Sequence, residues 1–377
     1  MNLVLTQEQQ LIRDSVHDYL AGSYDFSAHF AQLDSKTALD AGRWNDMAQL
    51  GWLGINVSEG AGGIGGTAMD AWVVMEGLGA SLCCEPVLST AVLSAPLLET
   101  AAKNSAEAGK VLAQVLDGKT SVAFAHAESA WGTDFFDLDT VAEPLADGGY
   151  RISGKKTLVP GGAGAQWLIV PARIHGAANG DIGLFLVSGE ASGLTRVGAP
   201  MLDGSWAADL VLDQVTVDVQ AVLCLPEAGR GMLKQVMRRA ISAQCAEAVG
   251  AMRAALAICK SYLLERRQFG KSLAEFQVLQ HRYVDMCIAY ERAYSMSLLA
   301  VDCVDAPTSE SDLDLSRAKV VVGQAARKIG GDAIQVHGGM GMTYEYPIGH
   351  YYRKLLLCDV QFGSADEHLQ SLMETSH

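Results

Sequence analysis

One acidic residue stands out within a long apolar helical stretch in the second half of the chain. This residue is Glu247, and its neighbours one turn away on the same helix face are small: Ala243, Gly250 and Ala251. A lone carboxylate that such side chains cannot cover costs free energy unless it is paired or used. Glu247 is therefore the candidate general base. The structural alternative is a buried hydrogen bond across a helix interface or an ion pair with one of three arginines: Arg238, Arg239 or Arg253.

A polar and aromatic cluster follows the same stretch. It reads RRQFG from Arg266 and continues to Gln277 and Gln280. A guanidinium group offers fork-shaped donors to phosphate. Further on, the segment QVHGG contains Gln335 and the pair Gly338–Gly339, and paired glycines let a backbone approach a ligand closely. These residues predict a site for a phosphate-bearing ligand.

The small residues around Glu247 also predict room for a bulky or long substrate group. The net charge of -15 argues against nucleic acid as a partner, because no basic field is present to meet its phosphates. The eight cysteines show no metal-ligand spacing and lie mostly in apolar helical runs. They predict buried thiols in a reducing compartment and no metal site.

The spacing RxxFGxxxxxFQxxQ, followed about sixty residues later by QVHGGMGMTYEYP, resembles the C-terminal half of acyl-CoA dehydrogenases. The resemblance extends over the whole chain and is closest to the small subunit of pimeloyl-CoA dehydrogenase and related two-subunit, α2β2 enzymes. It implies an FAD-dependent enzyme that introduces a double bond between Cα and Cβ of an acyl-CoA thioester. It also implies an electron-transfer flavoprotein as acceptor, and a dicarboxylyl-CoA such as pimeloyl-CoA or a sterol side-chain CoA as substrate.

The resemblance assigns roles to the cluster residues. Arg266 and Phe269 match positions that meet the FAD pyrophosphate and adenine across a subunit interface. Three residues match the segment whose backbone approaches the same group: Gln335, Gly338 and Gly339. Gln277 is counted with this cofactor-binding set.

The flavin-ring side departs from the family pattern. The stretch HAESAWGTD keeps four members of the family's loop: Glu128, Gly132, Thr133 and Asp134. However, Ala127 stands at the position of a threonine, and Thr157 and Val159 stand where a tryptophan and a threonine usually flank the ring. The ring could be held by backbone alone, or it could be held by another chain.

The family's base positions are also altered. Ser364 stands where many members carry a glutamate near the C-terminus, and Glu367 follows three residues later, where it could point elsewhere. A second family position for the base falls at Ala240–Ile241, which carries no carboxylate. Glu247 is the remaining candidate.

The elements around these residues predict an α+β fold in three segments. Residues 1–118 read as a helical domain that begins with a helix capped at Thr6. Residues 119–226 read as a middle domain of antiparallel strands, because short apolar runs alternate with turn residues. Residues 227–377 read as a four-helix bundle. Its helices are expected at 227–267, 273–304, 311–338 and 349–376.

Three further expectations concern the whole chain. The Gly-rich segment Gly60–Gly66 is a connection between helices, because it lacks the Lys-Ser/Thr ending of a phosphate loop. No apolar run reaches transmembrane length, so no membrane association is expected. The N-terminus lacks the basic start and apolar core of a signal peptide. A cytoplasmic location follows.

Three functions remain open from the sequence. The first is a subunit of a two-chain enzyme, a heterotetramer in which a large partner chain supplies the base and the flavin-ring pocket. The second is a self-sufficient homotetramer that uses Glu247. The third is a non-catalytic scaffold that binds acyl-CoA.

Overall fold

The computed structural model describes residues 5–35, 37–128, 135–177, 181–224 and 226–375. The chain divides into two compact units. The first contains the residues up to Asp34, Ala68–Cys83 and the chain from Ile241 onward. The second contains Ser35–Thr67 and Cys84–Ala240. The predicted N-terminal helical segment contributes to both units, and the three-domain division stays a prediction.

The first unit begins with α1, Gln7–Ser23. Thr6 caps this helix as predicted, with a reciprocal hydrogen bond to the side chain of Gln9 that forms a capping box. α2 spans Phe26–Ser35 and α4 spans Ala68–Ala80. α4 is buried along most of its length because small and apolar residues occupy nearly all its faces.

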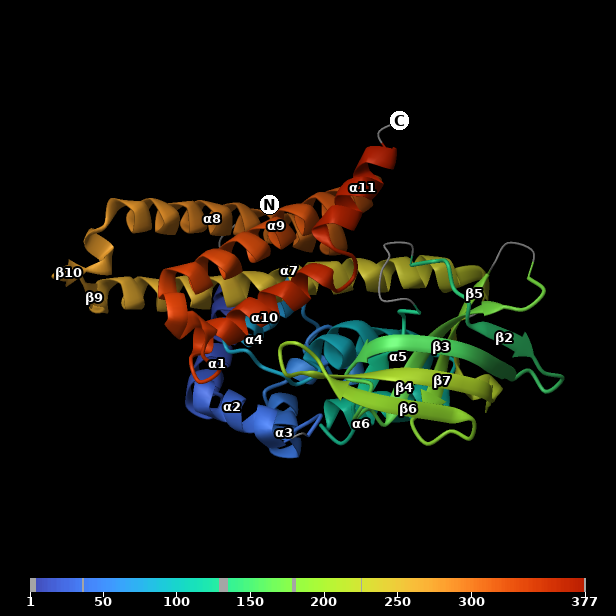
Figure 1. Ribbon diagram of the computed structural model, residues 1–377. Coiled ribbons are helices and arrows are strands. Elements are labelled where there is room, and N and C mark those ends of the chain that lie inside the picture. Colours follow the sequence, from blue (N-terminus) through green and yellow to red (C-terminus); the bar gives the residue numbers. More distant parts are fainter. Residues whose placement is uncertain (1–4, 36, 129–134, 178–180, 225, 376–377) are drawn as a thin grey trace. The chain divides into compact units, whose positions relative to one another are not determined.

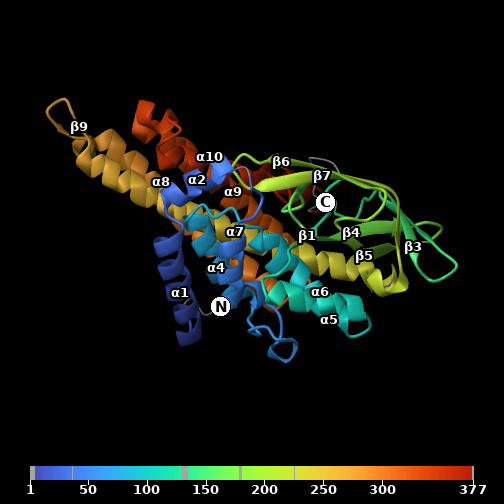
Figure 2. The same ribbon diagram turned by 90° about the horizontal axis from the view of Figure 1, so that it is seen from below.

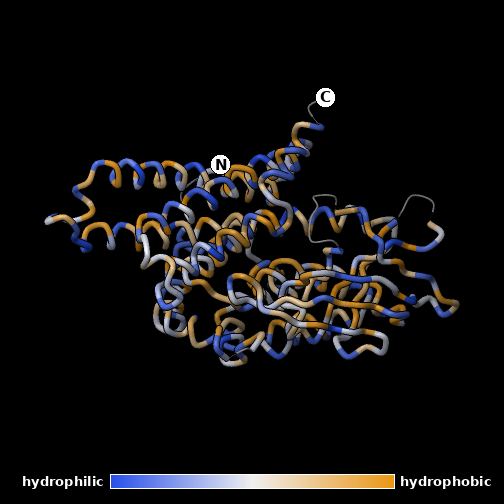
Figure 3. The backbone as a smooth tube through the Cα atoms, in the orientation of Figure 1, coloured by the Kyte–Doolittle hydropathy of each residue, from blue (hydrophilic) through white to orange (hydrophobic). Residues whose placement is uncertain are grey.

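Five helices make up the C-terminal part of the chain: α7 (Pro226–Glu265), α8 (Gln277–Asp305), α9 (Ser311–His337), α10 (Pro347–Val360) and α11 (Ala365–Thr375). A short hairpin of β9 (Arg267–Gln268) and β10 (Lys271–Ser272) joins α7 to α8 (Figure 1). Hydrophilic and hydrophobic residues alternate along α8 (Figure 3). The first three predicted helices are confirmed within a few residues of their predicted ends.

The fourth predicted helix, 349–376, is wrong as a single element. α10 ends at Val360, and α11 begins only at Ala365. Between them, Phe362 and Gly363 adopt positive φ angles of 58° and 91°, which a helix cannot contain. The C-terminal part therefore has five helices rather than the four expected.

The second unit combines short helices with a sheet. Its helices are α3 (Ala41–Gln49), α5 (Ala95–Ala102) and α6 (Ala106–Leu116), and a π-helical segment, η3 (Leu88–Ser94), runs directly into α5. The 3-10 turn η1 (Trp52–Gly54) precedes the Gly-rich connection, and a second 3-10 turn, η2 (Glu59–Ala61), overlaps its start. A Cβ at Gly63 would lie 2.2 Å from the Val57 carbonyl oxygen. This glycine therefore serves a close backbone approach.

Eight strands form one sheet in the order β6-β7-β3-β2-β4-β5-β8, and β1 pairs with β4. Their bounds are β1 (Val122–Phe124), β2 (Val141–Pro144), β3 (Tyr150–Pro160), β4 (Trp167–Ile174), β5 (Ile182–Ser188), β6 (Leu194–Pro200), β7 (Trp206–Val217) and β8 (Val222–Cys224). Figure 2 shows β3, β4 and β5 from below. Most pairs are antiparallel as predicted, but β1 and β2 each run parallel to β4.

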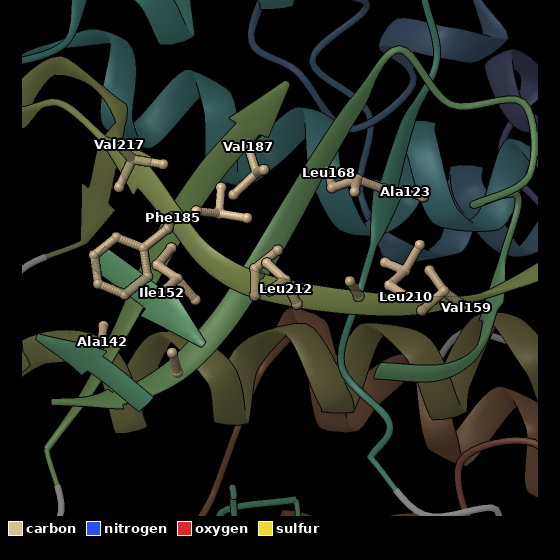
Figure 4. Close-up of a cluster of buried hydrophobic side chains, with 14 of the residues drawn as sticks. Ala123, Ala142, Ile152, Val159, Leu168, Phe185, Val187, Leu210, Leu212 and Val217 are labelled. Atoms are coloured by element: carbon tan, nitrogen blue, oxygen red, sulfur yellow. The ribbon is translucent and has the colours of Figure 1, made fainter. Parts of the chain in front are cut away.

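Apolar side chains on alternate positions of these strands form the core of the sheet (Figure 4). Ile152, Phe185 and Leu168 are fully buried there. Val159, expected from the sequence near the flavin ring, is a buried member of the same core.

The cysteines agree with the expectation of buried thiols. All eight lie in the described part of the chain and none forms a disulfide, and only Cys287 is partly exposed. Burial raises the pKa of Cys245 to about 11 and that of Cys259 to about 12, so both remain protonated thiols near neutral pH. Among the helices the structure describes, none is both long enough and apolar enough to cross a bilayer.

Candidate functional site

Glu247 lies on α7 with only 7% of its surface exposed. Its carboxylate forms an ion pair with the ammonium group of Lys354 on α10, and both side chains are more than nine-tenths buried. The amide of Gln244, one turn earlier, donates a second hydrogen bond to the carboxylate over 2.8 Å. The same amide donates to the sulfur of Cys358 over 3.0 Å. The carboxylate of Glu247 is thus paired with a lysine ammonium group from a different helix.

Of the three arginines considered as partners of Glu247, Arg253 has a different partner. Arg253 instead contacts Glu76 on α4 through two nitrogens, at 2.5 and 3.1 Å. The partner of Glu247, Lys354, lies more than a hundred residues further along the chain. Sequence spacing along one helix could not identify it.

Gly250, one of the small residues near Glu247, allows α7 to pack closely against α4. A Cβ at Gly250 would lie 1.8 Å from the Glu76 carbonyl oxygen, and a Cβ at Gly79 would lie 2.0 Å from the Glu247 carbonyl oxygen. α4 and α7 therefore approach to backbone contact at these two glycines. At Gly250, α4 leaves no room for an acyl group; the room predicted at the other small residues beside Glu247 stays a prediction.

The other two base positions offer no free carboxylate. Ala240 and Ile241 are buried apolar residues. Ser364 precedes α11. Its backbone N–H (2.7 Å) and its hydroxyl (2.8 Å) both donate hydrogen bonds to the Glu367 carboxylate. Ser364 and Glu367 thus form the capping box of α11. Glu367 indeed points elsewhere, as the sequence suggested.

The hairpin carries the first group of predicted cofactor residues at the far end of the α7–α8 pair (Figure 1). The Phe269 ring is 92% exposed, and its backbone holds a positive φ of 54°. Positive φ is unfavourable for a bulky residue, so the surrounding structure must maintain this backbone conformation. Arg266 is exposed at the end of α7, and Gln277 is exposed at the start of α8. Among the described residues, no hydrogen bond or ion pair to the Arg266 guanidinium is present.

The second group lies beside the first. Gln335, Gly338 and Gly339 are exposed at the end of α9, and a Cβ on either glycine would meet nothing within 4 Å. Tyr262 connects the two groups because its hydroxyl donates to the His337 carbonyl (3.3 Å) and its backbone carbonyl accepts from Arg266 N (2.9 Å). The structure thus brings the two sequence motifs together on one exposed surface.

The ring-side residues are occupied within the sheet unit. The Glu128 carboxylate lies 2.6 Å from the buried ammonium of Lys156 and also accepts from the backbone N–H groups of Asp139 and Thr140. Burial raises the pKa of Glu128, but Lys156 and the hydrogen bonds outweigh it, so the net pKa lies below its usual range. Burial lowers the pKa of Lys156 to about 8 against the opposing effect of Glu128.

The remaining ring-side groups also contact the protein itself. Thr157 donates its hydroxyl to the Glu128 carbonyl (3.3 Å) and its backbone N–H to the Ala127 carbonyl (2.7 Å). Three predicted members of this loop lie outside the described residues: Gly132, Thr133 and Asp134. The described ring-side side chains therefore stabilise the chain's own loop.

The sequence analysis missed two buried lysines that pair with the candidate site acids. Lys354 lies in the run YYRKLLLCDV and Lys156 lies in the run GKKTLVP. In each case a lysine adjoins apolar residues that are expected to be buried. A lysine at the edge of an apolar run could have been matched with a lone acidic residue in another such run.

Comparisons with known proteins find similar sequences along most of the chain. The family description "Acyl-CoA dehydrogenase, N-terminal domain" matches residues 6–119, and "Acyl-CoA dehydrogenase, C-terminal domain" matches residues 230–376. The chain is 27% identical to "Probable acyl-CoA dehydrogenase YngJ" of Bacillus subtilis, with 97% of each chain covered.

Solved structures show the same fold. The "Tcur3481-Tcur3483 steroid ACAD G363A variant" is 28% identical with a TM-score of 0.87, covering 98% of this chain and 97% of that one. The ChsE4-ChsE5 complex of Mycobacterium tuberculosis is 19% identical with a TM-score of 0.88, covering 100% of this chain and 99% of that one. At that identity, the second likeness concerns the fold alone.

Proposed function

Because the chain belongs to the acyl-CoA dehydrogenase family of FAD-dependent oxidoreductases, we propose that it is the small subunit of a two-chain enzyme. In this assembly an unlike, larger chain supplies the catalytic base and the flavin-ring pocket. One asymmetry carries the proposal. The residues at the cofactor-binding positions are exposed, while the only buried acid at a candidate base position, Glu247, is paired with Lys354.

The exposed surface suits the adenylate half of FAD. Arg266 can donate two parallel hydrogen bonds to a pyrophosphate, and the uncovered Phe269 ring can pack against adenine. Gly338 and Gly339 leave their backbone open to approach by an anionic group. Because these residues face outward from α7, α8 and α9, we propose that they hold FAD bound mainly to another chain.

The reaction needs a carboxylate that accepts a proton from Cα of the acyl group, while bound FAD supplies the hydride acceptor. Glu247 could take that role only by separating from the Lys354 ammonium, with which it forms a buried ion pair. The cost of breaking such a pair opposes proton transfer at this position. We therefore assign the base to the partner chain.

The substrate class is an acyl-CoA thioester, and we propose a dicarboxylyl-CoA or a sterol side-chain CoA. The 28% identical structure is named as a steroid ACAD, which supports the sterol option. Its name also joins two designations, Tcur3481 and Tcur3483, which supports a two-chain assembly. An electron-transfer flavoprotein is the proposed acceptor. One relative, 25% identical over 85% of this chain, is named as a subunit of a caffeyl-CoA reductase-Etf complex.

Two other functions would leave different signatures. A self-sufficient homotetramer would require Glu247 to act as base despite its ion pair. A non-catalytic scaffold would bind acyl-CoA but would support no dehydrogenation with any partner.

The first test is the flavin content of the purified chain, alone and after co-expression with a larger acyl-CoA dehydrogenase chain of the same organism. The proposal predicts little FAD and no turnover for the chain alone, with FAD uptake and turnover in a hetero-oligomer. About one FAD per chain, with turnover in the absence of any partner, would overturn it.

A further inference from the structure

A cleft of about 870 Å³ lies between α1, α4, α7 and α8, entirely within the first compact unit. This volume falls in the usual range for small-molecule sites. Two small residues, Gly77 and Ala254, contribute to its lining. A Cβ at Gly77 would lie 2.3 Å from a side-chain carbon of Val16, so this glycine lets α1 approach α4 at one side of the cleft. None of the predicted cofactor residues lines it.

Aromatic side chains form one side of this cleft. Trp72 and Tyr294 meet edge to face with ring centroids 5.6 Å apart, and Tyr290 lies 6.0 Å from Tyr294. Both tyrosines are only partly buried, so parts of their rings remain accessible. The apolar wall of the cleft on α1 consists of Val16 and Leu20, with 1% and 2% of their surfaces exposed, and the exposed Ala21.

Both arginines of the cleft are already paired. Arg13 lies 3.2 Å from Asp14 on the rim, and Arg253 holds Glu76 through two nitrogens. A phosphate or carboxylate ligand would have to compete with these internal carboxylates. The cleft therefore does not favour an anionic ligand such as CoA.

Two further carboxylates give the cleft an excess of negative charge. Asp18 has His17 as its neighbour at 3.8 Å, and both side chains are well exposed. Glu291 lies beside the tyrosines. Burial raises the pKa of Tyr294, and the carboxylates of Glu76 and Glu291 raise it further against the opposing effect of Arg13. Aromatic faces together with surplus carboxylates are the surroundings that organic cations prefer.

We propose that this cleft binds a small organic cation, an alkylammonium compound with a short apolar arm. The ammonium group lies against Tyr290 and Tyr294 with Asp18 and Glu291 as counter-charges. The arm packs on the apolar wall of α1. The site is separate from the residues assigned to FAD and from Glu247, so the test of this proposal does not depend on the proposed function.

Choline is a suitable probe because 3,3-dimethylbutan-1-ol has nearly the same shape without the charge. Binding to the full chain can be followed by ligand-observed saturation-transfer NMR. The informative variants are Glu291→Gln, Asp18→Asn and Tyr294→Leu. Asp285→Asn on α8 and Glu8→Gln on α1 are matched controls, since both acids are exposed on the same helices and do not line the cleft.

Saturable choline binding is expected, with each informative variant weakening it by about three- to tenfold and the controls leaving it unchanged. Higher salt should also weaken binding, because exposed carboxylates are screened. Equal binding of the neutral alcohol would overturn the cation assignment. Absence of choline binding, or binding that all the variants leave unchanged, would overturn the site itself.

Discussion

The carboxylate of Glu247 on α7 and the ammonium of Lys354 on α10 form a buried ion pair. Gln244 completes the surroundings of the carboxylate by donating a hydrogen bond from the same helix. This pair joins two helices that are distant in sequence. It also occupies the one buried acid that the sequence offered as a base.

Breaking this pair from one side should strongly destabilise the chain. Glu247→Leu leaves the Lys354 ammonium buried without its counter-charge, so we expect a loss of about 3 kcal/mol in the free energy of unfolding. The double variant Glu247→Leu, Lys354→Met replaces both charges by apolar groups and should recover most of that loss. Urea unfolding measures both effects.

A matched control uses an exposed ion pair. Arg317 lies 2.6 Å from Asp314, with its side chain half exposed. Arg317→Ala should therefore cost less than about 1 kcal/mol. An equal loss for Arg317→Ala and Glu247→Leu would contradict the structural role of the buried pair.

The close approach of α4 and α7 predicts a sharp difference between glycines. Gly250→Ala places a Cβ 1.8 Å from the Glu76 carbonyl oxygen, so the helices must separate, and we expect a loss of about 2 kcal/mol or more. Gly331→Ala, on α9, meets nothing within 4 Å and should stabilise its helix by up to about 1 kcal/mol. If both variants unfold at the same urea concentration, the helix contact is wrong.

Buried histidines predict lower stability in acid. Burial lowers the pKa of His126 to about 4, and burial likewise lowers the pKa of His368 to about 4. The folded chain then binds fewer protons than the unfolded chain between about pH 6.5 and 4. Stability should be full above pH 6.5 and should fall as the pH decreases through this window, by up to about 1.4 kcal/mol per pH unit for each histidine.

The urea midpoint measured between pH 7 and pH 5 tests this prediction. His368→Gln should reduce the pH dependence, whereas His281→Gln should leave it unchanged because His281 is an exposed residue on α8. A midpoint that is constant over this range in the unmodified chain would exclude the buried neutral histidines.

The exposed hairpin predicts a loss of flavin without a loss of fold. Arg266→Ala should weaken FAD retention in the two-chain assembly by about tenfold or more, because it removes a charged fork from the pyrophosphate. Arg266→Lys should retain more FAD than Arg266→Ala but less than the unmodified chain. Arg267→Ala is the control at the next exposed position. FAD content after dialysis is the measurement, and equal loss in Arg266→Ala and Arg267→Ala would contradict the assignment.

Local patterns were sufficient to predict much of the fold. The Thr6 cap, the long helices α7, α8 and α9 and the strand-rich middle are confirmed because periodicity, caps and turns are properties of short segments. The break before α11 was missed, since positive φ at Phe362 depends on surroundings that no local pattern reveals.

The candidate site was predictable only in part. Arg266 and Gly338 belong to ordered motifs, and the structure does bring those motifs together through Tyr262. The pairing of Glu247 with Lys354 depends on how two helices pack, as does the contact of Gly250 with α4. Tertiary contacts of this kind cannot be derived from spacing along one chain.

The most direct test of the central claim is turnover of the two-chain enzyme carrying Glu247→Leu and Lys354→Met in this chain. Because the base is assigned to the partner, the folded, flavin-loaded double variant should keep its turnover within about tenfold of the unmodified enzyme. A loss of about a thousandfold, typical for removal of a general base, with fold and flavin content intact, would contradict the account and identify Glu247 as the base.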